Sequence, residues 1–442
     1  MRLKKITAVA LTAIMSFSLV ACGGKNEGKA EDGVIEIEFP TYLAGENVGA
    51  TFFLPQIERF NEKYEGKYKI NIEEVPQASY ADKIKQLAQQ NKLPVLVHAP
   101  GSGGIDTQWF NQVILANDMA YDLTEFAEKN PDVVANWIPE SKEFCTVDGK
   151  LICKPISVLK PVGLYYNSSM YSADKDIKDM TMDEFIDSLG DNKIAFQTGE
   201  NGWTTGLFLS ALIANEEGGV ELLNNSVSDK LWDYTEPAFV NAITKLQKIL
   251  QSNASSNTVG AAYADAANAF MSKKAAIICN GSWMVSEFVD GSDDKWSNGF
   301  DGADVKTTIY PGNIALANPS TYGEFWIANT ASDEEKEVAE AFLAFRDSQE
   351  EIEALILAEG GKAPQLTYSD EFLTELQNTP LLYQLSESMD DETVYCAGLS
   401  DVLPASVADV EFGKLLPKLI DGSLTPEQFC KELTKKADEA KQ

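Results

Sequence analysis

The sequence predicts an α/β fold of two lobes, each an open sheet flanked by helices. The chain has 442 residues, more than one core of ordinary size supports. Strand and helix patterns alternate along most of its length, which favours sheets covered by helices. Pro155 and Pro161 interrupt this alternation and predict a crossover between the two units.

The chain begins with an export signal. Basic residues precede an apolar run from Ile6 to Ala21, which is shorter than the ~20 residues of a membrane-spanning helix. The run ends in Leu19–Cys22 and two glycines, which resembles the lipobox of bacterial lipoproteins. We expect residues 1–21 to be a lipoprotein signal peptide and Cys22 to carry the lipid. An ordinary signal peptide with a chance cysteine is the alternative.

Residues 22–33 are rich in Gly, Lys and Glu and predict a flexible tether. No later segment of the sequence is long and apolar enough to span a bilayer. We therefore expect the protein to contact the membrane only through lipidated Cys22, at the outer face of the bacterial cytoplasmic membrane.

The composition excludes several classes of function. The net charge of −32, from 36 Lys and Arg against 68 Asp and Glu, repels nucleic acid. The single histidine, His98, excludes multi-histidine metal sites, and it closes an apolar run, as is typical of a hydrogen-bonded residue at a strand end. No phosphate-binding glycine motif is present, and we expect no cofactor. The acidic stretch 290–304 predicts a solvated loop, with calcium binding left open.

The first lobe begins with a β-α-β-α-β order. Apolar residues alternate over 35–39 and again over 70–72, which predicts two half-buried strands. Apolar side chains at helical spacing over 53–64 and 80–87 predict the two helices. The short apolar run at 94–97 fits a strand in the middle of the sheet.

The second lobe repeats the alternation and then becomes mostly helical. Capping boxes begin helices after Thr181, Ser332 and Thr425. The remaining predictions are strands at 162–166, 193–196 and 275–279 and helices at about 202–214, 237–251 and 263–272.

Cys145 and Cys153 flank a predicted hairpin turn at Asp148-Gly149. In a two-residue hairpin Cys145 faces Ile152, which puts the two thiols on opposite faces. We therefore expect free buried cysteines, with a bridge between these two left open. The sequence has no CxxC motif, which argues against structural zinc.

Several segments together resemble the bacterial extracellular solute-binding proteins of family 1, the maltose-binding-protein-like receptors of carbohydrate ABC importers. The most specific is 267–283, in which a helix, a buried strand and an Asn-Gly-Ser-Trp loop follow one another. The other segments are 147–151 with Pro155, 163–167, Pro311, 322–324, 335–345 and 421–427.

This resemblance implies a periplasmic-binding-protein-like fold with a ligand cleft between the lobes. It implies a first lobe of residues 33–157 and 305–345 and a second lobe of 158–304 and 346–442. It also implies a monomer that is no enzyme, a small-molecule carbohydrate ligand, and ABC permease subunits as partners.

A sugar offers an apolar ring face and a rim of hydroxyls, which aromatic planes and polar groups satisfy. Loops at the carboxyl ends of strands are where α/β sheets bind ligands. Trp283 is the predicted platform, while packing is the alternative role for Trp203 and Tyr42. The ligand-binding candidates in or near such loops are Tyr42, Glu46, Asn47, Ser102, Gln197, Glu200, Trp203, Trp283, Tyr322 and Glu324.

Two other functions fit part of the sequence. An extracellular glycoside hydrolase needs two carboxylates that face one bond, and an acidic chain always offers chance pairs. A surface adhesin or sensor partner would use the same two-lobe fold. No hydrolase motif such as G-x-S-x-G occurs in the chain.

We predict that Cys22→Ser abolishes lipidation and leaves the precursor unprocessed or misplaced. The thiol is required because a thioether carries the lipid. Metabolic labelling with a tagged fatty acid measures this, and equal labelling of the variant and the wild type would contradict the lipobox.

Overall fold

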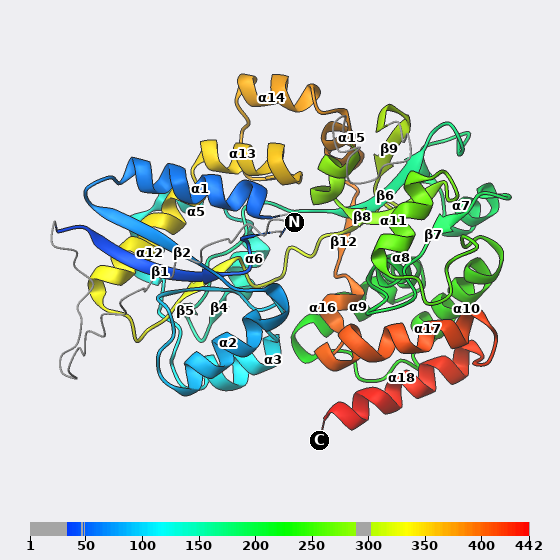
Figure 1. The fold of residues 1–442 in the computed structure, drawn as a ribbon, viewed down its shortest axis with the longest axis horizontal. Helices are drawn as coiled ribbons and strands as arrows, with labels where there is room; N and C mark the ends of the chain where they lie inside the picture. Colours follow the sequence, from blue (N-terminus) through cyan, green and yellow to red (C-terminus); the bar gives the residue numbers. More distant parts are fainter. Residues whose placement is uncertain (1–32, 46, 48, 289–301, 442) are drawn as a thin grey trace, which may run out of the picture.

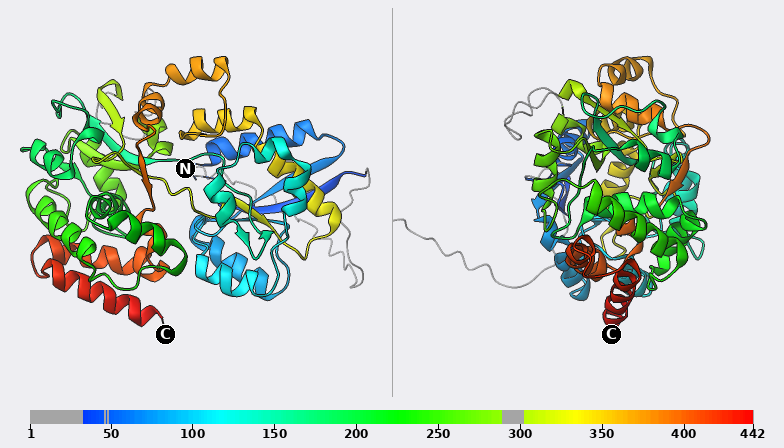
Figure 2. Two further views of the ribbon diagram at one scale, coloured as in Figure 1. Left: turned by 180° about the vertical axis from the view of Figure 1, so that it is seen from behind. Right: turned by 90° about the vertical axis from the view of Figure 1, so that its right-hand side faces the viewer.

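The computed structural model describes residues 33–45, 47, 49–288 and 302–441. Figure 1 shows two lobes side by side, the first coloured blue, cyan and yellow and the second green, orange and red, and the left view of Figure 2 shows them from behind. Helices and strands alternate in both, which confirms the predicted α/β fold. The signal peptide, Cys22 and nearly all of the tether lie outside the described residues.

The first lobe places helices on both sides of its strands. It contains β1 (Ile35–Thr41), α1 (Ala50–Lys63), β2 (Tyr68–Glu74), α2 (Gln77–Gln89), β3 (Leu96–His98), α3 (Thr107–Trp109), η1 (Phe110–Leu115), α4 (Thr124–Lys129), α5 (Pro131–Val134), α6 (Pro139–Phe144), β4 (Thr146–Val147), β5 (Lys150–Leu151), β11 (Phe325–Ile327) and α12 (Asp333–Arg346).

The strands of the first lobe pair over large separations in sequence. β1 and β2 are parallel, in register from Ile35 opposite Tyr68 to Thr41 opposite Glu74. β3 pairs antiparallel with β11, so a segment more than 200 residues later completes this lobe. Because β1 and β3 both end at one edge, their following loops come together there.

The second lobe holds the larger sheet. It contains β6 (Val162–Asn167), η2 (Ile177–Asp179), α7 (Met182–Ser188), β7 (Ile194–Ala195), α8 (Trp203–Ala214), α9 (Gly219–Asp229), α10 (Pro237–Ser252), α11 (Tyr263–Met271), β8 (Ile277–Gly281), η3 (Ser282–Phe288), η4 (Gly302–Asp304), β9 (Val305–Thr308), β10 (Ile314–Leu316), α13 (Gln349–Glu359), α14 (Asp370–Gln377), α15 (Pro380–Ser388), β12 (Val394–Cys396), α16 (Leu399–Val402), η5 (Val407–Glu411), α17 (Phe412–Ile420) and α18 (Pro426–Ala440). Among the described helices, none has both the length and the apolar character needed to cross a bilayer.

The sheet of the second lobe corrects one predicted boundary. Its strand order is β12-β10-β6-β8-β7, with β9 also paired to β6. The assignment of residues 305–345 to the first lobe is therefore wrong at its beginning. β9 pairs antiparallel with β6, and β10 pairs with both β6 and β12, so the chain stays in the second lobe to Leu316. It re-enters the first lobe at β11.

Local sequence signals are confirmed at the helix starts. The side chains of Thr181, Ser332 and Thr425 each accept a hydrogen bond from the backbone N–H three residues later. The side chain of that later residue accepts one in return from the backbone N–H of the capping residue. α8 is buried on nearly every face because its residues are apolar all round. It passes through the centre of the second lobe, between the sheet and α9, α10 and α16.

The two cysteines of the hairpin do not lie as predicted. The prediction of thiols on opposite faces is wrong, because Cys145 caps the end of α6 and only residues 146–147 and 150–151 form strands. The backbone N–H of Ile152 does bond the Cys145 carbonyl, at 3.0 Å. All five described cysteines are buried with free thiols.

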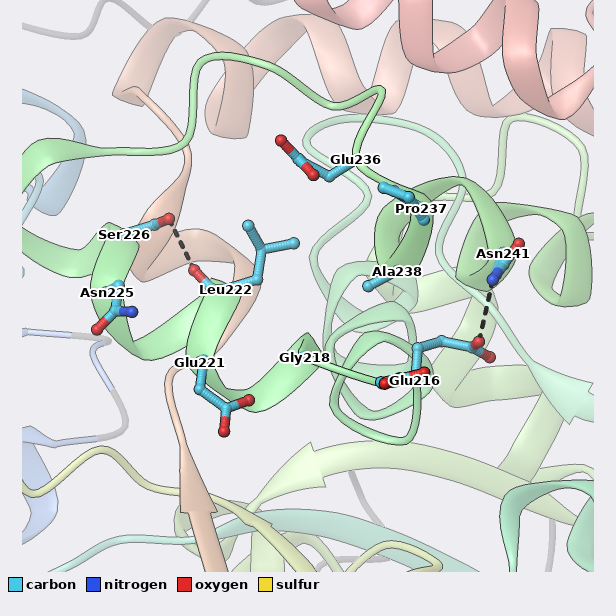
Figure 3. A pocket seen from close by; sticks show the side chains of 11 residues that line it. Glu216, Gly218, Glu221, Leu222, Asn225, Ser226, Glu236, Pro237, Ala238 and Asn241 are labelled. Atoms are coloured by element: carbon cyan, nitrogen blue, oxygen red, sulfur yellow. Dashed lines mark hydrogen bonds between the residues drawn. The ribbon is translucent and has the colours of Figure 1, made fainter.

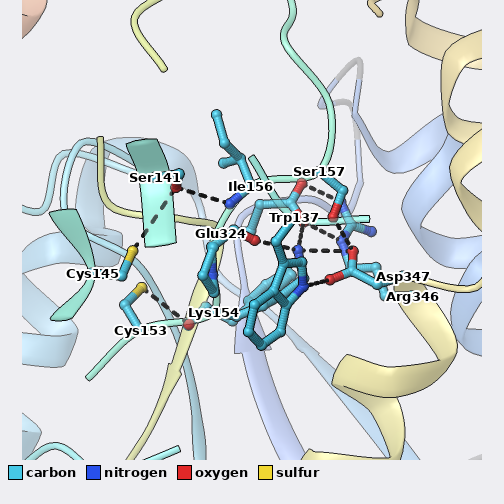
Figure 4. Close-up of polar contacts among 12 residues, drawn as sticks. Trp137, Ser141, Cys145, Cys153, Lys154, Ile156, Ser157, Glu324, Arg346 and Asp347 are labelled. Carbon is cyan, nitrogen blue, oxygen red and sulfur yellow. Dashed lines mark hydrogen bonds and ion pairs between the residues drawn. The ribbon is translucent and has the colours of Figure 1, made fainter. Parts of the chain in front are cut away.

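The chain crosses between the lobes in segments 152–161, 317–324 and 346–348. Charged side chains of these three crossovers meet in one buried cluster, which Figure 4 shows. Lys154 lies 2.9 Å from Asp347 and 3.2 Å from Glu324. The Arg346 guanidinium donates hydrogen bonds to both carboxylate oxygens of Glu324, at 2.6 and 2.7 Å. Two cations therefore face two anions where the crossovers pack.

Neutral donors complete this cluster. Asp347 accepts hydrogen bonds from Trp137 Nε1 at 2.6 Å and from Ser157 Oγ at 2.9 Å. The side chain of Lys154 is 1 % exposed and that of Asp347 3 %. Burial lowers the pKa of Lys154, but the charges of Asp347 and Glu324 outweigh it and raise the pKa above its usual value. Burial raises the pKa of Asp347, and the charge of Lys154 acts against this rise. The ion pairs and hydrogen bonds of the cluster therefore offset part of the cost of desolvation.

Helix α13 adds a second connection. Near its start, Glu351 accepts hydrogen bonds from Arg59 at 2.7 Å and from Gln56 at 2.9 Å, both on α1. At its end, Glu359 pairs with Lys160 of the first crossover at 2.6 Å. α13 therefore ties the first lobe to the segment that leads into the second.

We predict that Lys154→Met lowers the free energy of unfolding by about 3–5 kcal/mol, because the substitution leaves Asp347 buried without its cation. Urea unfolding measures the change. Lys129→Met is the matched control, since Lys129 forms an ion pair with Glu125 in which both side chains are about two-thirds exposed. Equal unfolding midpoints for the two variants would contradict a structural role for the cluster.

Candidate functional site

Two tryptophans form an aromatic surface on the second lobe. Trp203 begins α8 and Trp283 follows β8, yet their rings stack with centroids 6.2 Å apart and an interplanar angle of 29°. Both are only partly buried. The Trp283 ring lies over Gly281, where a Cβ atom would overlap the ring. The missing side chain at Gly281 therefore lets the indole lie in this position.

Polar groups border this aromatic surface. Gln197 is buried, and its amide donates to Glu200 at 3.0 Å and to Asn201 at 3.1 Å. Glu200 is exposed and has a φ of 52°, an uncommon conformation that turns the loop toward α8. Its carboxylate also accepts a hydrogen bond from the backbone of Tyr263 at 3.3 Å. Gln197 thus stabilises the conformation of the loop, while Glu200 and Asn201 stay accessible to solvent.

The first lobe contributes Tyr42, which follows β1. Tyr42 and Ser102, which lies in the loop after β3, share a side-chain hydrogen bond. The Tyr42 ring packs against Tyr80 and His98, with centroids 5.4 and 4.7 Å away. Burial raises the pKa of Tyr42 to about 12, so the phenol stays protonated and can donate a hydrogen bond.

His98 holds this loop cluster in place. Its Nε2 lies 2.8 Å from Thr41 Oγ1, and the ring stacks on Phe39. Burial lowers the pKa of His98 to about 3, so the imidazole is neutral at physiological pH. The predicted role of a hydrogen-bonded residue at a strand end is confirmed.

The two groups of residues come near each other at the end of α13. A Cβ atom at Gly49, in the loop after Tyr42, would lie 3.8 Å from Glu359. Gly360, the residue after Glu359, packs against Ser282, which precedes Trp283. Glu359 therefore lies between the loop of the first lobe and the Trp283 loop of the second. α3 also contacts α9 across the lobes.

Three other candidate residues have different surroundings. Asn47 bonds Gln77 at 3.0 Å and caps Gly49. Tyr322 is buried in the core of the first lobe, where its hydroxyl donates to Asn111 at 2.8 Å. Glu324 belongs to the buried charge cluster, and the cations there hold the pKa of its carboxyl well below the usual range despite burial. Glu46 lies outside the described residues.

Sequence reasoning did not identify Lys160 and Glu359. Their side chains are 27 % and 15 % exposed, and they place an ion pair beside Tyr42 and the crossover. No local pattern marks them, because the pair joins residues about 200 positions apart. The Gly360-Gly361 pair after α13 is the one signal in the sequence, since it indicates a close approach of backbone there.

A larger cavity lies elsewhere on the second lobe. It has a volume of about 650 Å³. Figure 3 shows its lining side chains, which come from α9, the start of α10 and the residues just before each helix. Glu216, Glu217, Glu221 and Glu236 line it, and no aromatic side chain does. A cavity of about 40 Å³ beside Trp203 is too small for a sugar. No described group of His, Cys, Asp or Glu side chains forms a metal site.

Comparison with models of known protein families finds a match to one family. The model of the bacterial extracellular solute-binding proteins matches residues 56–381. A search of the curated proteins finds no match to this sequence.

Solved structures match over almost the whole chain. A chitin oligosaccharide binding protein is 17 % identical with a TM-score of 0.70, over 92 % of this chain and 99 % of that one. A Streptococcus pneumoniae solute-binding protein in complex with the blood group A-trisaccharide is 19 % identical with a TM-score of 0.67, over 91 % and 98 %. A structure from work on xylan utilization by Caldanaerobius polysaccharolyticus is 19 % identical with a TM-score of 0.66, over 91 % and 100 %. At these identities the likeness concerns the fold.

Proposed function

Because this chain belongs to the bacterial extracellular solute-binding proteins, we propose that it binds a carbohydrate between its two lobes and delivers it to an ABC permease. The ligand class is an oligosaccharide. The protein acts as a monomer held by lipid on Cys22 at the outer face of the cytoplasmic membrane.

The stacked pair of Trp203 and Trp283 carries the proposal. Two indoles 6.2 Å apart offer an apolar surface wider than one ring, and both remain partly exposed. The apolar face of a pyranose covers such a plane and releases water from both surfaces. A surface that extends over two rings fits more than one sugar unit, which favours an oligosaccharide.

Polar groups around this surface fit the hydroxyl rim of a sugar. Glu200 and Asn201 border the tryptophans, and the Tyr42 phenol and Ser102 stand on the first lobe. Carboxylate, amide and hydroxyl groups together accept and donate hydrogen bonds, as a hydroxyl rim requires. A ligand that touches both lobes favours the closed arrangement, because only there does it make all of its contacts.

Three structural neighbours are a chitin oligosaccharide binding protein, a solute-binding protein in complex with the blood group A-trisaccharide, and a structure from work on xylan utilization. They support the sugar class as analogues in fold. Which sugar this chain binds depends on its own loops, since none of these neighbours exceeds 19 % identity.

The carboxylates beside Tyr42 argue against glycoside hydrolysis. A hydrolase needs a carboxylic acid of raised pKa to protonate the leaving oxygen. Glu324 is clamped by Arg346 and Lys154, which hold its pKa well below the usual value. Glu359 forms an ion pair with Lys160 at 2.6 Å. Glu324 therefore lacks the environment of a general acid, and the Glu359 carboxylate is engaged by an ammonium group.

We predict that Trp283→Ala weakens sugar binding at least about tenfold, or roughly 1.4 kcal/mol, while the fold survives. Trp283→Phe loses less, since a smaller plane remains. A thermal-shift screen of a glycan panel first selects the sugar, and calorimetry then measures the affinity. Trp232→Ala is the control, since Trp232 bonds Asp229 and packs near Lys441, away from Trp283. Unchanged affinity in Trp283→Ala would remove the platform from the proposal.

We also predict that the selected sugar reduces the radius of gyration in small-angle scattering. The ligand bridges the lobes, and the crossovers allow rotation as in other hinged binding proteins. Trp283→Ala at the same sugar concentration should keep the larger radius. A saturating sugar that leaves the wild-type profile unchanged would refute closure, and loss of intact sugar over hours would instead indicate a hydrolase.

A further inference from the structure

A pair of thiols lies directly beneath the second crossover, outside the proposed sugar site. Cys145 ends α6 and Cys153 follows β5, and both side chains are fully buried. Figure 4 shows the two side chains next to each other. The thiols share a hydrogen bond. The hairpin between them therefore brings together two residues that the strand pattern alone would separate.

Both thiols also bond the crossover itself. Cys145 Sγ donates to the Thr321 carbonyl at 3.7 Å, and Cys153 Sγ to the Phe325 carbonyl at 3.1 Å. The Gly323 amide in turn donates to the sulfurs. A Cβ at Gly323 would overlap the Lys154 carbonyl, so this segment presses on the first crossover. The thiols thus help to hold residues 321–325 against the charge cluster.

The two thiols are chemically unequal. Burial raises the pKa of Cys145, but the hydrogen bond from Cys153, the Gly323 amide and the Lys154 charge outweigh it and leave the pKa below its usual value. Burial and the neighbouring Cys145 raise the pKa of Cys153. These pKa directions belong to the docked hairpin, in which Lys154 and the Gly323 amide favour a negative charge on Cys145.

We propose that Cys145 and Cys153 are a site of reversible disulfide formation that changes the packing of the 321–325 crossover. One of the two thiolates attacks an external disulfide, forms a mixed disulfide and releases one thiolate. The other cysteine's thiolate then attacks the protein sulfur of the mixed disulfide and releases the second. Two electrons and two protons pass to the external disulfide, which leaves as two thiols. Because both sulfurs are buried, exchange takes place while the hairpin is undocked, during folding outside the cell.

Oxidation removes both S–H donors. The Thr321 carbonyl keeps its bond from Ser141 at 3.0 Å, and the Phe325 carbonyl keeps its bond from the Lys154 backbone at 2.8 Å. The Thr321 and Phe325 carbonyls each lose one hydrogen bond, and the two sulfurs lose the one that they share. The oxidised crossover is therefore held less firmly than the reduced one.

Mass spectrometry of the full mature chain tests the bond. Protein isolated from cells in N-ethylmaleimide is digested with trypsin, which cuts after Lys150 and so separates the two cysteines. We expect the peptides that begin at Glu143 and Leu151 to be disulfide-linked, and dithiothreitol to release them. Cys430→Ser removes a buried thiol elsewhere and should keep the link, whereas Cys145→Ser should lose it.

Hydrogen exchange tests the effect on the crossover. Amides of residues 321–325 should exchange at least about threefold faster in oxidised than in reduced wild type, and Cys145→Ser should show no such difference. If both cysteines carry maleimide after isolation and also after refolding in oxidised glutathione, the site is refuted. Equal exchange in linked and reduced protein would overturn the coupling to the crossover.

Discussion

The buried ion cluster of Lys154, Glu324, Arg346 and Asp347 is the constraint on which the two-lobe arrangement depends. Each of the three crossovers supplies at least one of these charges. Burying four charges is costly, and the cost is offset only while all partners are present at hydrogen-bond distance. The crossovers must therefore pack in one way, and that packing sets where each lobe presents its loops.

From this base, each lobe contributes a different kind of surface. The second lobe presents stacked indoles, whose attraction for an apolar face has little dependence on direction. The first lobe presents Tyr42 and Ser102, whose hydrogen bonds require a defined geometry. Under the proposed function, affinity comes mainly from the second lobe. The first lobe contributes specificity, because its hydrogen bonds depend on how the sugar hydroxyls are arranged. The loops of both lobes lie near Glu359, at the end of α13, the helix that also contacts α1.

The sequence predicted what depends on neighbouring residues. The capped starts at Thr181, Ser332 and Thr425 are local hydrogen-bond motifs, and the strand at 35–39 follows from alternation. The ion cluster escaped prediction because Lys154 and Asp347 lie 193 positions apart, and no pattern within either segment reveals its partner.

The same limit applies to the site. Trp203 and Trp283 were each identified as candidates from their position after a strand, but their stacking follows from how α8 packs on β8. The lobe boundary near 305 was wrong because strand partners are chosen across the sheet. The thiol geometry was wrong because a helix end replaced the expected strand residue at Cys145.

The stacked tryptophans also give the protein its own optical reporter. Two indoles with centroids 6.2 Å apart and an interplanar angle of 29° are close enough for their excited states to couple. Their near-ultraviolet circular dichroism is then a property of the pair, and it changes whenever either ring rotates. The circular dichroism of this one ring pair thus reports the state of a surface built from segments that are 80 residues apart in the chain.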